Sequence, residues 1–216
     1  MSLVDGLGCW ARVRQPSTVL SASALFLDRD GVIIEDVGYL SRPLGIRLID
    51  GAASAIARVN ALGVPVVSVT NQSGIARGLY TWSDFEAVQD ALEHELMQHS
   101  AYLDLVLACG YYGVGHGELN VSDHAWRKPN PGMLLAARDQ LKLNLDECFI
   151  VGDRISDLEA GRRAGLHWGF LVRTGYGGEA ETKLAALPPE FNVSAVDSLA
   201  EAIGESFAFL SARNLR

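Results

Sequence analysis

Short apolar runs alternate with longer amphipathic stretches along most of the chain. The runs read ALFL, VPVVSV, LDLVLAC, CFIVG and HWGFLV, at 24–27, 64–69, 103–109, 148–152 and 167–172, and a shorter FNVSAV follows at 191–196. Apolar runs of this length, bounded by polar and turn residues, are typical of buried strands. Their alternation with helical stretches predicts β-α-β units and therefore a mostly parallel sheet.

The amphipathic stretches carry helix-boundary signals. At 51–63 an apolar stripe is formed by Ala52, Ile56, Val59 and Leu62, and Gly63 is suited to end the helix. A further helix is expected after Pro131, another from Ser156 as its cap to Gly165, and a last one near 197–213.

The strongest helical signal lies at 81–100. Thr81 is suited to the N-cap, and Asp84 stands where the reciprocal partner of a capping box is expected. The apolar face of this helix is predicted to consist of Phe85, Val88, Leu92 and Leu96.

These elements predict an α/β fold, a three-layer doubly wound and mostly parallel sheet of the Rossmann type. Predicted helices and strands already fill most of the intervals 30–70 and 70–128, so neither has room for a separate cap domain. We expect one domain over 23–216. Residues 1–22 are expected to form an N-terminal extension, a loosely ordered tail of unknown role.

Composition narrows the class of partner. The 216 residues carry a formal net charge of −8, which argues against a nucleic-acid surface or an anionic membrane surface. No apolar run approaches the length of a membrane span. The three cysteines are few and widely spaced, which favours a reducing cytoplasm. We expect a cytoplasmic monomer with a small-molecule substrate.

Polar residues follow the apolar runs where the strands should end. Asp28 and Asp30 follow the first run, and Asp153 follows CFIVG, with Asp157 one helical turn further. The second run is followed by Thr70, Asn71, Gln72 and Ser73, and Lys128 lies in a loop before a helix. Because parallel strands end at one edge of the sheet, these groups are expected to converge.

That set of groups suits phosphoryl transfer. Asp28 is the candidate nucleophile, which would form an aspartyl-phosphate, and Asp30 is the candidate general acid and base. Mg²⁺ would be held by the side chains of Asp28 and Asp153 and by the backbone carbonyl of Asp30. Thr70 and Lys128 would hold the transferring oxygens.

The motifs FLDRDGVI, VTNQSGIARG, RKPNPGM and VGDRISDLEAG resemble the four motifs of the haloacid dehalogenase (HAD) superfamily of phosphatases. DVGYL, TNQSGIARG and RKPNPGM are similar to signatures of the D-glycero-D-manno-heptose 1,7-bisphosphate phosphatases and of the related histidinol-phosphate phosphatases. The resemblance implies the same catalytic and Mg²⁺ residues, Asp28, Asp30, Asp153, Thr70 and Lys128. The substrate contacts that it implies are Asp36, Val37, Gly38, Tyr39, Asn71, Gln72, Ser73, Arg127 and Arg154, the last standing where relatives often have Lys.

One loop departs from that subgroup. The subgroup usually carries Cys-x-His and then Cys-x-Cys before RKP, a structural zinc site. Here Cys109 is kept, but Tyr111 replaces the histidine, and His124 and Trp126 replace the cysteines. Structural zinc needs four ligands.

Three candidate zinc ligands nevertheless remain in this loop, Cys109, His116 and His124, with Asp123 or Glu118 as a fourth. We favour a zinc-free loop that is ordered by packing of Tyr111, Tyr112 and Trp126.

Four possibilities stay open at this point. The resemblance favours removal of the C7 phosphate of heptose 1,7-bisphosphate, in the synthesis of lipopolysaccharide precursors. Histidinol phosphate is the second candidate, followed by another small sugar phosphate. The non-enzymatic alternative is an inactive phosphate-binding α/β module.

Overall fold

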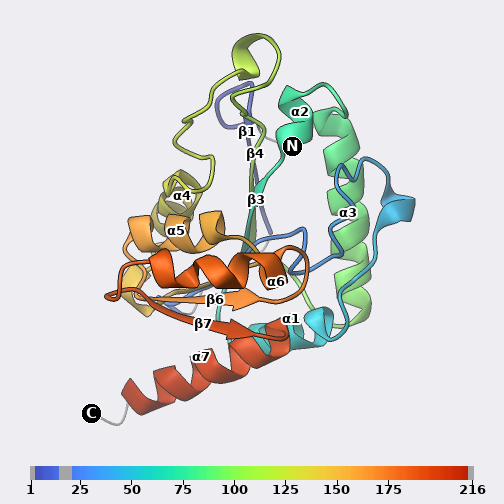
Figure 1. Ribbon diagram of the computed structural model, residues 1–216. Coiled ribbons are helices and arrows are strands. Elements are labelled where there is room, and N and C mark those ends of the chain that lie inside the picture. The colour runs from blue at the N-terminus through green and yellow to red at the C-terminus, as the bar shows by residue number, and fades with distance from the viewer. Residues whose placement is uncertain (1–2, 15–20, 214–216) are drawn as a thin grey trace.

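A seven-stranded sheet runs through the centre of the molecule in the order β1-β4-β3-β2-β5-β6-β7. The computed structural model describes residues 3–14 and 21–213 (Figure 1). The strands are β1 Cys9–Val13, β2 Leu25–Leu27, β3 Val66–Asn71, β4 Leu105–Cys109, β5 Phe149–Gly152, β6 Trp168–Val172 and β7 Asn192–Val196. β2 to β7 pair in parallel, and β1 pairs antiparallel with β4.

The helices cover both faces of the sheet, which confirms the predicted three-layer arrangement. They are α1 Ala52–Ala61, α2 Ser73–Ala76, α3 Trp82–Gln98, α4 Gly132–Leu141, α5 Ile155–Ala164, α6 Gly177–Ala180 and α7 Leu199–Arg213. In Figure 1, α3 lies on one side of β3 and β4, and α4 and α5 lie on the other. No separate cap domain is inserted into the described chain between these elements.

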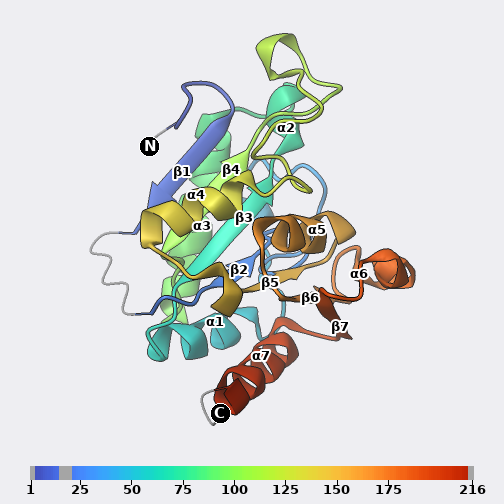
Figure 2. The same ribbon diagram turned by 90° about the vertical axis from the view of Figure 1, so that its left-hand side faces the viewer.

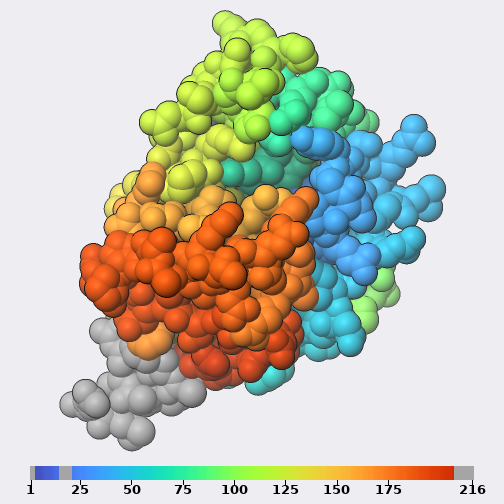
Figure 3. Space-filling model, viewed as in Figure 1, coloured from blue at the N-terminus to red at the C-terminus, as the bar shows by residue number. Residues whose placement is uncertain are grey.

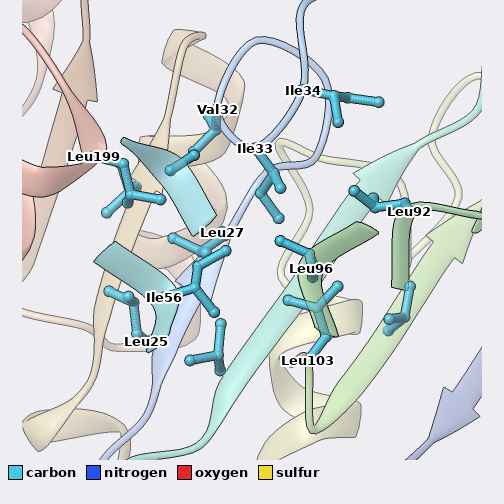
Figure 4. Packing of buried hydrophobic residues seen from close by; sticks show 14 of the residues in the cluster. Leu25, Leu27, Val32, Ile33, Ile34, Ile56, Leu92, Leu96, Leu103 and Leu199 are labelled. Carbon is cyan, nitrogen blue, oxygen red and sulfur yellow. The ribbon is translucent and has the colours of Figure 1, made fainter. Parts of the chain in front are cut away.

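Alternation along each strand divides the core into two layers. Leu25 and Leu27 of β2 pack with α1 and α3 residues such as Ile56 and Leu92, whereas Phe26 points to the layer that contains Leu134 of α4. Figure 4 shows the first layer, in which side chains from the sheet meet those of the covering helices. All of these side chains are buried.

The helix boundaries agree with most of the sequence signals. Thr81 and Asp84 form the predicted capping box at the start of α3, and Phe85, Val88, Leu92 and Leu96 are buried. Gly165 ends α5 as expected.

One prediction of an apolar helix face and one of a helix boundary are wrong. Leu62 is predicted to lie on the apolar face of α1, but the residue is 62% exposed. The helix ends at Ala61, so Leu62 no longer follows the helical stripe that faces the core. The N-cap of α5 is Arg154 and not Ser156; the Arg154 backbone N–H donates to Asp157 Oδ2 at 2.9 Å.

The N-terminal segment corrects a larger prediction. Residues 9–13 are not a loose tail, because they form β1, the edge strand beside β4 in Figure 2. Trp10 is fully buried, its indole N–H donates to Glu86 Oε1 at 2.9 Å, and its ring meets Phe85 edge-on. Residues 1–2 and 15–20 of the predicted extension lie outside the described residues.

Within the described chain, no helix combines the length and apolar character needed to cross a membrane.

Candidate active site

The carboxyl ends of β2, β3 and β5 open onto a cavity of about 420 Å³. Asp28 lies directly after β2, Thr70 lies within β3 near its end, and Asp153 follows β5. In Figure 3 the cavity opens between the blue segment near residue 40 and the yellow-green loop near residue 115. The lining residues are Asp28, Asp30, Asp36, Gly38, Tyr39, Thr70, Asn71, Gln72, Ser73, Arg77, Tyr80, Tyr112, Arg127, Lys128, Arg154, Ser156, Asp157 and Tyr176.

Three buried carboxylates meet at the base of this cavity. Oxygens of Asp28, Asp153 and Asp157 lie within 4.8 Å of one another. Lys128 Nζ lies 3.0 Å from Asp28 Oδ1 and 2.7 Å from Asp157 Oδ1, and it donates to the Val69 carbonyl at 2.7 Å. One buried ammonium group therefore faces several carboxylates, so this region has an excess of negative charge.

The local charge shifts the pKa values of these groups. Burial raises the pKa of Asp28 well above its ordinary value, and neighbouring carboxylates add to the rise although Lys128 opposes it. Burial also raises the pKa of Asp153 to about 6, with Asp157 contributing. Burial by itself would lower the pKa of Lys128, but Asp157 and Asp28 together keep it above its ordinary value.

This region meets the requirements of a divalent cation that prefers oxygen ligands. Asp153 Oδ1 is buried and accepts no hydrogen bond from the described chain, while Asp153 Oδ2 accepts one from the Tyr176 N–H at 2.8 Å. A buried carboxylate oxygen without a donor is costly unless a cation neutralises it. The closely spaced oxygens and the excess negative charge therefore fit Mg²⁺.

Gly31 makes this packing possible. Its φ is +85°, and a Cβ atom there would collide with Asp153 Oδ2. A glycine is therefore required at this point of the DRDG motif on both conformational and steric grounds.

The carboxylate of Asp30 accepts its shortest hydrogen bonds from Arg29 and Gln72, and a longer one of 3.5 Å from Thr70 Oγ1. Arg29, fully buried, donates from Nε to Asp30 Oδ2 and from Nη2 to Asp30 Oδ1, both at 3.2 Å. Gln72 Nε2 donates to Asp30 Oδ2 at 3.0 Å and to Thr70 Oγ1 at 2.8 Å.

The Gln72 amide is oriented in turn by Tyr80, whose hydroxyl donates to Gln72 Oε1 at 2.5 Å. Burial raises the pKa of Tyr80, so this hydroxyl stays protonated as a donor. The carboxylate of Asp30 is thus fixed before any substrate arrives.

The loop that carries Lys128 is fixed to the end of β3. Asn71 Nδ2 donates to the Lys128 carbonyl at 3.0 Å, and the Lys128 N–H donates to Asn71 Oδ1 at 3.1 Å. This reciprocal pair positions the ammonium group next to Asp28. Positive charge is therefore held where a phosphoryl group would meet the carboxylate.

The outer wall of the cavity is basic and aromatic. The guanidinium of Arg77 lies near the rings of Tyr39 and Tyr112, at 5.8 and 4.6 Å from their centroids, and that of Arg127 lies 4.5 Å from Tyr112. Arg154, which also lines the cavity, stacks on Tyr176 at 3.8 Å and lies 3.4 Å from Asp36 Oδ2.

Most residues that the sequence singled out line this cavity. Val37 does not line it and is exposed, and Asp153 lies beneath it, fully buried. Two other arginines, Arg42 and Arg173, do not line the cavity. Arg173 instead pairs with Glu181 and Asp197.

Sequence reasoning missed several cavity residues. Asp157 stands one helical turn after Asp153 in the sequence, but the predicted Mg²⁺ ligands do not include it. Tyr80, Tyr112 and Tyr176 also line the cavity. The sequence does not mark these three tyrosines as cavity residues, because their position in the cavity depends on which loops pack together in the folded protein.

The three candidate zinc ligands of the loop are not gathered. Among the described residues, His124 groups with Asp5 and Cys9, and neither Cys109 nor His116 belongs to that group. Of the three aromatic residues expected to order the loop, Tyr111 is buried and stacks on His124 at 3.9 Å. Trp126 packs against the second core layer.

The chain resembles known phosphatases over most of its length. A family model described as HAD-hydrolase-like matches residues 125–202. The D-glycero-beta-D-manno-heptose-1,7-bisphosphate 7-phosphatase of Mesorhizobium japonicum is 51% identical over 149 residues, which are 69% of this chain and 69% of that protein.

Two solved structures share the fold. A HAD-like phosphatase from Mesorhizobium loti aligns with a TM-score of 0.79 and 42% identity, covering 93% of this chain and 92% of that one. The D,D-heptose 1,7-bisphosphate phosphatase of B. bronchiseptica, complexed with magnesium and phosphate, aligns with a TM-score of 0.75 and 32% identity. It covers 86% of this chain and 98% of that one.

Proposed function

We infer that this chain, which belongs to the haloacid dehalogenase superfamily of phosphatases, removes the C7 phosphate of D-glycero-D-manno-heptose 1,7-bisphosphate. The observation that carries this inference is the pairing of Asp28 with Lys128 at the base of a cavity whose outer wall holds Arg77 and Arg127. The base suits the phosphate that is transferred, and the outer wall suits a second phosphate on the same sugar.

In the proposed first step, Asp28 attacks phosphorus and the bond to the sugar oxygen breaks. Asp28 Oδ1 accepts a hydrogen bond from the Arg29 backbone N–H and lies 3.0 Å from Lys128 Nζ, which leaves Oδ2 as the attacking atom. Asp30 donates a proton to the departing C7 oxygen, so this oxygen leaves as a neutral hydroxyl of heptose 1-phosphate. The product on the protein is an aspartyl-phosphate.

In the second step Asp30 accepts a proton from water, which attacks the phosphorus of the aspartyl-phosphate. Inorganic phosphate leaves and the Asp28 carboxylate is regenerated. Lys128 and Thr70 hold the phosphoryl oxygens through both steps and offset their charge. Asp28, Asp153 and the Asp30 carbonyl would hold Mg²⁺, which when bound would offset the repulsion between the Asp28 carboxylate and the substrate phosphate. Asp157 lies close enough to support this site.

Histidinol phosphate is less suited to this cavity. Its aminoalkyl group is cationic and would face the guanidinium groups of Arg77 and Arg127. A second phosphate would instead find charge-assisted donors there. The basic outer wall therefore favours a bisphosphate over a substrate that carries a single phosphate and an amine.

The test is phosphate release with Mg²⁺ from the α and β anomers of heptose 1,7-bisphosphate and from histidinol phosphate. Because the Mesorhizobium japonicum relative is named for the β anomer, we expect the highest kcat/KM with that anomer. A higher kcat/KM for histidinol phosphate would refute the proposed substrate while leaving the mechanism intact. We further propose a monomeric enzyme of the cytoplasm, which gel filtration and cell fractionation would test.

A further inference from the structure

Tyr111 joins the loop before Arg127 to the N-terminal segment. Its hydroxyl donates to Asp5 Oδ2 at 2.8 Å, and its ring stacks on His124 with a centroid distance of 3.9 Å and an interplanar angle of 17°. These two aromatic residues stand at positions where the resembled subgroup has metal ligands. The side chains are therefore joined by stacking and by a hydrogen bond to the N-terminal segment.

Both carboxylate oxygens of Asp5 accept hydrogen bonds. Oδ1 accepts from the backbone N–H groups of Leu7, Gly8 and Cys9 at 3.0, 3.0 and 2.9 Å, while Oδ2 accepts from Tyr111. Although burial alone would raise the pKa of Asp5, these hydrogen bonds hold it well below its ordinary value. The carboxylate therefore stays charged and orders the turn that leads into β1.

The turn fits closely against Tyr111. A Cβ atom on Gly8 would collide with the Tyr111 ring, so the glycine allows the two segments to touch. The Gly110 N–H donates to the Gly8 carbonyl at 2.8 Å, and Trp82 Nε1 donates to the Leu7 carbonyl at 2.9 Å. The N-terminal turn is thus anchored to β4 and to α3 together.

A metal ion is the rival explanation of this cluster. Ligand atoms of Asp5, Cys9 and His124 lie within 4.8 Å of one another, but among the described residues the group contains three ligands and not the four of a structural zinc site. The Asp5 oxygens already accept hydrogen bonds, and burial raises the pKa of the Cys9 thiol. The hydrogen-bonded arrangement accounts for these contacts without a metal.

The contact leads directly to the cavity wall. Arg127 Nη1 donates to the Tyr111 carbonyl at 3.0 Å, and its guanidinium lies over the ring of Tyr112, the next residue. The Tyr112 N–H in turn donates to the Leu119 carbonyl at 3.1 Å, within the same loop. A shift of Tyr111 would therefore displace both groups that hold Arg127.

We propose that Asp5 and Tyr111 form a metal-free clamp that orders the loop 110–126 and positions Arg127. The N-terminal segment would then do for this loop what zinc does in the resembled subgroup. Tyr111 acts through Arg127 and is a positioning residue. The effect on substrate rests on the proposed function, whereas the effect on loop order does not.

Tyr111→Phe tests the clamp because it removes one hydroxyl and keeps the ring. We expect amide hydrogen exchange in 110–126 to be about tenfold faster, as loss of one hydrogen bond to a charged group implies. KM for the bisphosphate should rise severalfold, and kcat/KM for p-nitrophenyl phosphate should stay within about twofold. Asp5→Ala should act in the same direction. Tyr102→Phe, a matched change outside this loop, should alter neither quantity.

Two results would overturn the clamp. One is unchanged exchange in 110–126 for both Tyr111→Phe and Asp5→Ala. The other is one equivalent of zinc or another transition metal in wild-type protein purified without chelator, lost in His124→Ala, as measured by plasma mass spectrometry. If wild-type protein fails to hydrolyse heptose bisphosphates, the proposed substrate is refuted, but hydrogen exchange and metal content still decide the clamp.

Discussion

Lys128 Nζ lies 3.0 Å from Asp28 Oδ1, and both side chains are buried. The same ammonium group lies 2.7 Å from Asp157 Oδ1, so it is shared between two carboxylates. Even with Arg154 Nε 4.0 Å from Asp153 Oδ1, the three carboxylates of Asp28, Asp153 and Asp157 outnumber the two cations beside them. The negative charge of the proposed nucleophile is therefore destabilised in the metal-free protein by neighbouring carboxylates. This destabilisation affects both protein stability and catalysis.

Asp28→Asn should abolish turnover without harming the fold. An amide cannot attack phosphorus as a carboxylate does, and we expect kcat to fall at least about 10⁴-fold, as for other lost nucleophiles. Because the substitution removes one buried negative charge, the Tm of the metal-free protein should not fall and is expected to rise. Phosphate release and thermal unfolding in EDTA measure the two effects. Retained turnover would exclude Asp28 as the nucleophile.

The affinity for Mg²⁺ should depend on pH. Burial raises the pKa of Asp153 to about 6, so below this pH its carboxyl is protonated and a cation must displace the proton. Affinity should thus be at least about tenfold weaker at pH 5 than at pH 7, measured by calorimetry. A pH-independent affinity would mean that Asp153 is not a ligand.

The same pKa shift predicts the pH dependence of stability. A carboxyl whose folded-state pKa is raised binds its proton more tightly in the folded state, so its contribution to stability falls as pH rises from about 4 to about 7. Asp153→Asn removes this titration. In EDTA, the Tm of Asp153→Asn should therefore exceed that of the wild type by more at pH 7 than at pH 4.

Tyr80→Phe should weaken proton transfer by Asp30. Without the hydroxyl, the Gln72 amide is free to rotate and present its oxygen to Asp30 Oδ2 instead of Nε2. We expect single-turnover formation of the aspartyl-phosphate to slow about tenfold with an alkyl phosphate. The change should be small with p-nitrophenyl phosphate, whose leaving group needs no proton. An equal loss with both substrates would indicate a general structural effect.

The sheet and the base of the cavity were predictable because their signals are local. Three of the apolar runs are followed by a polar residue, Asp28, Thr70 or Asp153, whose place at the sheet edge follows from parallel pairing. The capping box of Thr81 and Asp84 likewise lies within a few residues of sequence.

The parts that sequence reasoning missed depend on contacts between distant segments. β1 is short and alternates Cys9, Ala11 and Val13 with Trp10 and Arg12, so it looks like neither a buried strand nor a helix. Its strand character comes from pairing with β4. In the same way, the Asp5–Tyr111 contact joins residues that no spacing rule connects.

Arg127 is the residue for which substrate preference can be tested most directly. Its guanidinium reaches the cavity from a loop that does not carry the proposed nucleophile, and burial lowers its pKa without neutralising it. If it contacts the distal phosphate, Arg127→Ala removes a charge-assisted hydrogen bond. We expect kcat/KM for heptose 1,7-bisphosphate to fall about 10- to 100-fold.

A substrate without the distal phosphate supplies the decisive comparison for this variant. With heptose 7-phosphate, Arg127→Ala should change kcat/KM by no more than about threefold, because the contact that it removes is not made. Arg58→Ala, on the exposed surface of α1, is the matched control and should leave kcat/KM unchanged for both substrates. An equal fall in kcat/KM for the bisphosphate and the monophosphate would show that Arg127 does not bind the distal phosphate. It would then support the loop or contact the reacting phosphate.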